Sequence, residues 1–152
     1  MRIEKTIGEF IANRKSPVAA PGDSVVSAVE VMKQSGQSCV LVCEADRLVG
    51  IFTERDFLNR IAAAERDPTT TILADVMTSE PGTLTPEDCV TYAINRMAVG
   101  GYRNVPIVDR DGRVVANLSV RDVLSHIEDV FAEVDEDDYH ESSAEWTDIG
   151  GG

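Results

Sequence analysis

Apolar positions along the chain switch between helical and extended spacing, and the same switch occurs twice. Residues 25–32 and 90–97 carry apolar side chains at helical spacing, each set after an acidic residue and before a glycine. Each set is followed by a nearly continuous apolar run, at 39–43 and 105–108. Such runs are typical of strands that are buried on both faces. The pattern predicts a helix and then a buried strand in each half of the chain.

Each buried run turns back into a second strand. The turns fall at 44–47 and 109–112, and the Asp-Gly step at the end of the second turn favours a hairpin. The return strands are predicted at 48–52 and 114–118. Closing helices follow each return strand, because apolar residues again recur at helical spacing.

A lead-in segment precedes each of these patterns. Short helical segments at 7–13 and 73–77 run into extended segments that end at proline turns, 17–21 and 81–86. After its lead-in helix, each half therefore reads β-α-β-β-α.

The two halves are copies of one unit. Gly50–Asp56 recurs 66 residues later as Ala116–Asp122, and further positions match at an offset of 65 or 66. The sequence predicts an α/β (α+β) fold of two pseudo-symmetric units that pack as one module. The predicted parts are a first unit at 7–62, a linker at 63–71, a second unit at 72–130 and an acidic, disordered tail at 131–152.

The repeated heptad ends in a candidate site. Thr53 and Ser119 stand at predicted helix N-caps, with Asp56 and Asp122 three residues later, as in a capping box. A cap alone stabilises a helix by about 1 kcal/mol, which is a sufficient structural reason for the pattern. A carboxylate also binds hydroxyl groups strongly, and a helix N-terminus attracts anions. The heptad therefore fits both a cap and a ligand site.

The charge is unevenly distributed. The net charge is −13, but residues 1–127 hold all 14 Lys and Arg against 17 acids, and residues 128–152 hold the other ten acids. This balance argues against nucleic-acid binding, which depends on neutralising phosphates. The acidic tail fits either a solvated segment or an electrostatic arm that competes with an anionic ligand or contacts a basic partner.

Other classes of function find little support in the sequence. No apolar run approaches the roughly 18 residues of a membrane span, so no membrane contact is expected. The N-terminus lacks the apolar run of a signal peptide, which predicts a cytoplasmic location. Cys39, Cys43 and Cys89 fit reduced core thiols better than a metal site. The two histidines, His126 and His140, belong to no catalytic arrangement, so no enzyme is expected.

Over residues 7–130, the tandem unit and its closing Gly-apolar-apolar-Thr/Ser-x-x-Asp heptad resemble a pair of CBS (cystathionine-β-synthase) domains. The resemblance implies a disc-like module with two clefts, many examples of which bind AMP, ATP, NAD or S-adenosylmethionine. It implies that Thr53 and Asp56 hold ribose or phosphate in one cleft, and that Ser119 and Asp122 do so in the other. It also places Val18 and Thr83 against adenine.

The copies differ around these positions. Arg103 stands where the resemblance implies a phosphate contact, whereas the first copy has no cation in the matching segment 37–41. Arg55 and Arg121 each precede a motif aspartate and are either phosphate contacts or solvated side chains. Asn117 replaces an apolar residue of a buried strand, and either contacts a base or sugar or hydrogen-bonds a neighbouring backbone group. We therefore expect the two clefts to bind unequally.

The function expected from these observations is a non-catalytic regulatory module that binds AMP, ADP or ATP, with NAD and S-adenosylmethionine as further candidates. No cofactor is required. The expected partners are a second copy of the chain, in a homodimer, and a protein target that the sequence does not identify. The alternative is a dimerisation or protein-interaction module in which one or both clefts are degenerate.

Overall fold

The computed structural model describes residues 5–135, and the chain divides between Ser119 and Val120 into two compact units. Each unit is described by itself. The second unit contains one described element, α6 (Val120–Asp135), which continues into the segment predicted as a tail. The rest of that segment, 136–152, lies outside the described residues.

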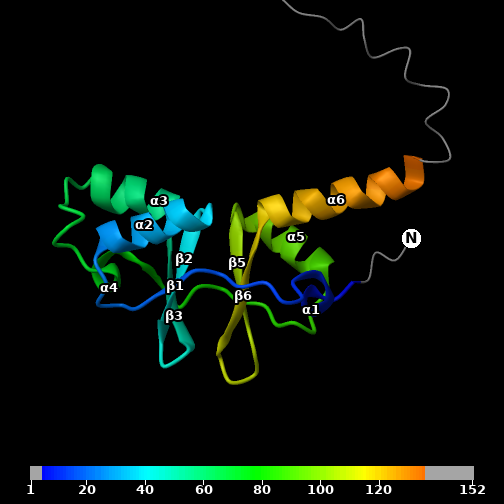
Figure 1. Ribbon diagram of the computed structural model, residues 1–152, viewed down its shortest axis with the longest axis horizontal. Helices are drawn as coiled ribbons and strands as arrows, with labels where there is room; N and C mark the ends of the chain where they lie inside the picture. The colour runs from blue at the N-terminus through cyan, green and yellow to red at the C-terminus, as the bar shows by residue number, and fades with distance from the viewer. Residues whose placement is uncertain (1–4, 136–152) are drawn as a thin grey trace, which may run out of the picture. The chain divides into compact units, whose positions relative to one another are not determined.

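The first copy contains the helices and strands that its pattern predicts (Figure 1). They are α1 (Ile7–Phe10), β1 (Val18–Ala19), α2 (Val25–Ser35), β2 (Cys39–Glu44), β3 (Arg47–Thr53), α3 (Glu54–Asp56) and the π-helix η1 (Phe57–Ala62). Ser24 caps α2 by accepting a hydrogen bond from the Ser27 N–H. The helix ends at Gly36, whose φ of 65° lies in the left-handed region that glycine adopts without strain. The predicted closing helix is thus one turn of α-helix followed by a wider π-helical turn.

The second copy repeats this order. It contains α4 (Leu73–Val76), β4 (Thr78–Ser79), α5 (Val90–Gly100), β5 (Asn104–Val108) and β6 (Val114–Ser119). The extended segment predicted at 81–86 is reduced to one parallel bridge between Leu84 and Ile107. This bridge is the counterpart of the parallel pairing between β1 and β2.

The strands form two sheets. β1 to β4 form one sheet in chain order, and β5 and β6 form an antiparallel pair (Figure 1). β4 belongs by sequence to the second copy, yet it pairs with β3 of the first. The sequence pattern did not predict β4. Because of this strand, the second copy's lead-in runs beside the start of the first copy's heptad, at Gly50 and Ile51.

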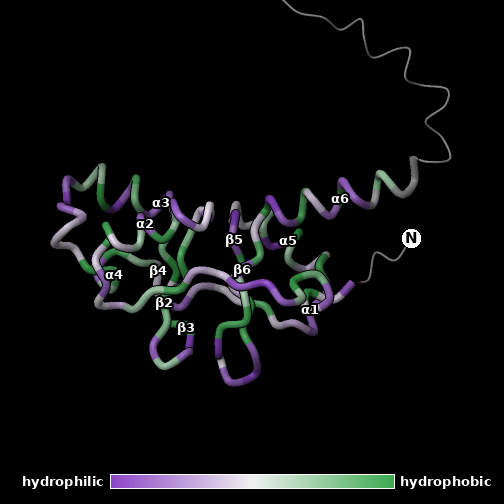
Figure 2. The backbone as a smooth tube through the Cα atoms, viewed as in Figure 1, coloured by the Kyte–Doolittle hydropathy of each residue, from purple (hydrophilic) through white to green (hydrophobic). Residues whose placement is uncertain are grey.

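One part of the core lies between α2 and the first sheet. Val40, Val42 and Phe52 point from β2 and β3 towards apolar residues of α2 and α4. Their strands are apolar along the middle, and the hairpin turns are hydrophilic (Figure 2). Gly50 allows close packing here, because a Cβ atom on it would lie 2.5 Å from Met77 Sδ and 3.0 Å from the Thr78 carbonyl. The space beside this motif glycine therefore holds β4.

The opposite face of β2 and β3 forms a seam towards β6. Cys39, Leu41 and Ile51 cluster there, with Val114 of β6 packed against them. In the second copy, Asn104 of β5 occupies the position that Cys39 occupies in the first copy. Asn117 of β6 likewise occupies the position of Ile51. The seam is therefore apolar on the first copy's side and carries two amides on the second copy's side.

Candidate functional site

Thr53 and Asp56 form the capping box that the sequence predicts. The Thr53 hydroxyl accepts from the Asp56 N–H at 3.2 Å, and Asp56 Oδ2 accepts from the Thr53 N–H at 3.0 Å. The Thr53 hydroxyl also lies 3.2 Å from the same carboxylate oxygen. Asp56 is one of two buried polar or charged residues in the described part of the chain, at 8% exposure. The reciprocal bonds hold its carboxylate in a fixed orientation at the start of α3.

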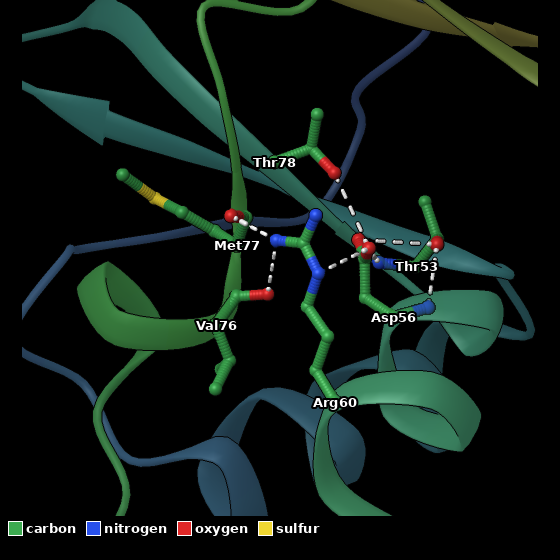
Figure 3. A network of polar contacts seen from close by, with 6 residues as sticks. All are labelled: Thr53, Asp56, Arg60, Val76, Met77 and Thr78. Atoms are coloured by element: carbon green, nitrogen blue, oxygen red, sulfur yellow. Dashed lines mark hydrogen bonds and ion pairs between the residues drawn. The ribbon is translucent and has the colours of Figure 1, made fainter. Parts of the chain in front are cut away.

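Two further side chains reach the other oxygen of Asp56 (Figure 3). The Thr78 hydroxyl donates to Asp56 Oδ1 at 3.2 Å, and Arg60 Nε lies 3.7 Å from the same atom. Arg60 Nη1 donates to the carbonyls of Val76 and Met77, at 3.0 and 2.6 Å. We call Thr53, Asp56, Arg60 and Thr78 the first motif site. The first copy therefore does have a cation at its site, the guanidinium of Arg60, although segment 37–41, which matches the segment around Arg103, contains none.

Sequence reasoning missed Arg60 and Thr78, for different reasons. Arg60 stands four residues after Asp56, the spacing at which side chains on one helix face meet, so this signal was present. Thr78 is 22 residues away and reaches Asp56 only because β4 pairs with β3. No local pattern marks that pairing.

The remaining predicted residues of unit 1 lie at several separate places. Arg55 is exposed on α3, and Arg103 is exposed just before β5. Val18 is 53% exposed in β1, opposite Leu41, and Thr83 is half-buried beside the Leu84 bridge. No described hydrogen bond or ion pair joins any of these four to the first motif site.

Asn117 lies in a polar network along the seam. Its Nδ2 donates to Asn104 Oδ1 at 2.9 Å, and Asn104 Nδ2 donates to the Ser38 hydroxyl at 3.1 Å. The Asn117 N–H donates to the Ser16 hydroxyl at 2.7 Å. Asn117 Oδ1 is buried and has no hydrogen-bond partner among the residues that the structure describes. We call Ser16, Ser38, Asn104 and Asn117 the seam network.

This network differs from one of the two expectations for Asn117. The side-chain nitrogen contacts another side chain rather than a backbone group, and contact with a base or sugar stays a prediction. A buried amide oxygen without a donor costs about 1–3 kcal/mol. The seam network therefore contains one unsatisfied group.

The second heptad crosses the division of the chain. Ser119 ends β6 opposite Asn104, within unit 1. Arg121 is exposed and Asp122 half-buried in the first turn of α6, within unit 2. The roles of Ser119, Arg121 and Asp122 stay predictions.

The similarity of the chain to known proteins agrees with this tandem arrangement. The CBS domain family matches residues 7–63 and again residues 73–129. The chain belongs to the CBS domain family. Each match contains one β-α-β-β-α unit and its closing heptad, so the two repeats are two CBS domains.

Individual CBS proteins resemble the chain in sequence or in fold. CBS domain-containing protein CBSCBSPB1 of Arabidopsis thaliana is 33% identical over 101 residues, which are 66% of this chain and 19% of that protein. The chain thus spans about a fifth of that relative. The crystal structure of the CBS domain NE2398 has a TM-score of 0.76 and 25% identity, over 82% of this chain and 98% of that one. The CBS domain protein PAE2072 from Pyrobaculum aerophilum, complexed with AMP, has a TM-score of 0.72 and 20% identity, over 84% and 98%.

Among the described residues, no three His, Cys, Asp or Glu side chains gather where they could hold a metal ion. Within residues 5–135, no helix has the length and hydropathy of a membrane span.

Cys39 is expected to resist alkylation in the folded CBS pair. Burial raises its thiol pKa to about 12, with a smaller contribution from the Glu54 carboxylate. The raised pKa keeps the thiol protonated in the folded state. The unfolded thiol ionises near its ordinary pKa of 9.0, so the contribution of Cys39 to the free energy of unfolding is lost as the pH rises above about 9. At pH 8, iodoacetamide followed by peptide mass spectrometry should modify Cys39 only after unfolding. Modification of Cys39 in the folded protein as fast as in urea would contradict this burial.

Proposed function

We propose that the protein is a regulatory module that binds an adenosine-containing nucleotide such as AMP, ADP or ATP, and that it catalyses no reaction. The observation that carries the proposal is the first motif site. A largely buried carboxylate is fixed at a helix N-terminus within a CBS pair, with a guanidinium beside it. PAE2072, which has the same fold, is complexed with AMP, and this supports the choice of ligand.

The chemistry of the first motif site suits a ribose. Two vicinal hydroxyls can donate to one carboxylate, and hydrogen bonds to a charged acceptor are stronger than neutral ones. Asp56 is the acceptor in this proposal, and Thr53 lies beside it to contact ribose or phosphate. In this proposal Arg55, which is exposed on α3, would meet a phosphate, and Val18, which is exposed on β1, would contact adenine.

In the second CBS domain, the proposal assigns ribose to Asp122 and Ser119. Arg103 and Arg121 would bind phosphate, Thr83 would contact adenine, and Asn117 a base or sugar. Because the seam differs between the copies, we propose that the two sites bind with unequal affinity. Ligand binding would shift the module between conformations that a protein target distinguishes.

The second candidate function is a dimerisation or interaction module. Exposed apolar side chains on helices of unit 1 favour it, namely Leu58 on η1 and Tyr92 and Val99 on α5. A homodimer in the cytoplasm fits either function. Saturable binding of one or two nucleotides per chain would exclude an interaction module in which neither site can still bind a nucleotide.

Titration calorimetry with AMP, ADP, ATP, NAD and S-adenosylmethionine tests the proposed function. We expect at least one adenine nucleotide to bind, and Asp56→Asn to weaken binding at the first site about ten-fold or more, because the charge-assisted bonds are lost. Asp122→Asn assigns the second site in the same way. Native mass spectrometry of protein purified without added ligand reports stoichiometry and oligomeric state. If none of the five ligands binds, the proposed function is wrong.

A further inference from the structure

The protein already engages both carboxylate oxygens of Asp56. Oδ2 accepts from the Thr53 N–H and hydroxyl, Oδ1 accepts from the Thr78 hydroxyl, and Arg60 Nε lies 3.7 Å from Oδ1 as an ion pair. A carboxylate offers about four lone-pair positions, and three of them accept hydrogen bonds from the protein. Two vicinal ribose hydroxyls therefore need a position that a protein donor holds.

The contacts to the two carboxylate oxygens of Asp56 differ in what is lost when they break. The bonds to Oδ2 belong to the capping box, and breaking them would uncap α3. The bonds to Oδ1 come from Thr78 and Arg60, which lie outside the capping box. A ribose that binds Asp56 while α3 stays capped must take Oδ1.

The backbone around Thr78 is held by a short strand pairing, by the Glu80 N–H, which donates to the Val49 carbonyl at 3.2 Å, and by bonds from Arg60. β4 has two residues, paired through Ser79 with Gly50 and through Thr78 with Ile51. The carbonyls just before β4, on Val76 and Met77, accept from Arg60 Nη1. A two-residue edge strand gives little stability of its own, so these side-chain bonds contribute much of its attachment.

The two residues beside Asp56 Oδ1 are not repeated at the matching positions of the other copy. At the offset of 66, Thr78 matches Ala12, which has no hydroxyl, and Arg60 matches His126. The Thr78 contact is thus a property of the first motif site.

We infer that Thr78 is an internal competitor for the ribose position, which occupies Asp56 Oδ1 until a nucleotide displaces it. The inference rests on the proposed function. Nucleotide binding at the first site then breaks the Thr78–Asp56 bond and loosens β4. The ligand thereby acts on the strand that joins the second CBS domain's lead-in to β3, while Leu73 and Val76 of that lead-in stay packed in the core of the first. Thr78 and Arg60 set the affinity and the conformational response of this site.

Thr78→Val removes the competing hydroxyl at nearly constant volume. We expect AMP to bind Thr78→Val about three- to ten-fold more tightly than wild type, the range that one net hydrogen bond gives. Both proteins carry Asp122→Asn, so that calorimetry reports the first site. Thr78→Ser, which keeps the hydroxyl, should restore the lower affinity. Ser79→Ala, on the same strand, is the matched control and should leave the affinity unchanged.

Hydrogen exchange gives a second readout. AMP should increase amide exchange in residues 77–80 of the wild-type protein, and have a smaller effect in Thr78→Val. If AMP binds and Thr78→Val has the same affinity as wild type or a lower one, Thr78 is not a competitor, although the proposed function stands. If AMP binds the chain with Asp122 intact but neither of these two proteins, the first site takes no nucleotide and this inference fails alone. If none of the five ligands binds the chain with Asp122 intact, the proposed function fails and this inference fails with it.

Discussion

Asn117→Asp is expected to lower the free energy of unfolding by about 2–4 kcal/mol at pH 7. Asn117 is 3% exposed, and its Nδ2 donates to Asn104 Oδ1. The substitution places a carboxylate oxygen against that amide oxygen and buries a charge with no cation bonded to it in the described network. Since Asn117 Oδ1 already lacks a donor, the seam network has no spare group to compensate.

The pH dependence distinguishes buried charge from poor packing. Burial raises the pKa of the introduced carboxyl above its unfolded value near 4, so the folded state favours the protonated form. The destabilisation should therefore be largest at neutral pH and shrink as the pH falls towards about 5. Urea denaturation of Asn117→Asp and Asn117→Leu at pH 7 and pH 5 measures this. Asn117→Leu removes the unsatisfied oxygen and should change stability by less than about 1 kcal/mol at both values. Equal losses in the two variants would show that charge is not the cause.

Local sequence patterns were sufficient to predict most of the fold. Both hairpins, both long amphipathic helices and their glycine ends follow from spacing and turn chemistry, and the structure confirms them. The capping box of Thr53 and Asp56 is also local, because its bonds join residues three apart. The burial of Asn117 followed from its place in an apolar strand and is confirmed.

Contacts between the copies could not be predicted in the same way. The Thr78 bond depends on the pairing of β4 with β3, and the Asn104 bond to Ser38 joins residues 66 apart. These contacts form when the two copies pack, and no spacing within either copy encodes them. The packing beside Gly50 is a further case, because Met77 and β4 fill the space next to it and no spacing within the first copy indicates this.

Asp56→Ala is expected to lower the free energy of unfolding by about 2–3 kcal/mol, the largest part from hydrogen bonds whose donors lose their acceptor. The Asp56 side chain is 11% exposed and accepts from Thr53 and Thr78. The bond between Arg60 and Asp56 adds little, because the Arg60 side chain is 45% exposed and water can replace the carboxylate. The capping box alone accounts for about 1 kcal/mol of the loss.

Asp88 provides a matched control within the same chain. Its Oδ2 accepts from the Thr85 N–H at 2.7 Å and lies 3.2 Å from the Thr85 hydroxyl, as Asp56 Oδ2 does with Thr53. The described hydrogen bonds and ion pairs give Asp88 no counterpart of Thr78 or Arg60. Asp88→Ala should therefore cost about 1 kcal/mol, from local bonds alone. The difference between the two variants, measured by urea denaturation, reports what the bonds to Oδ1 contribute. If the two losses are equal, the contacts of Thr78 and Arg60 with Asp56 Oδ1 contribute nothing to stability.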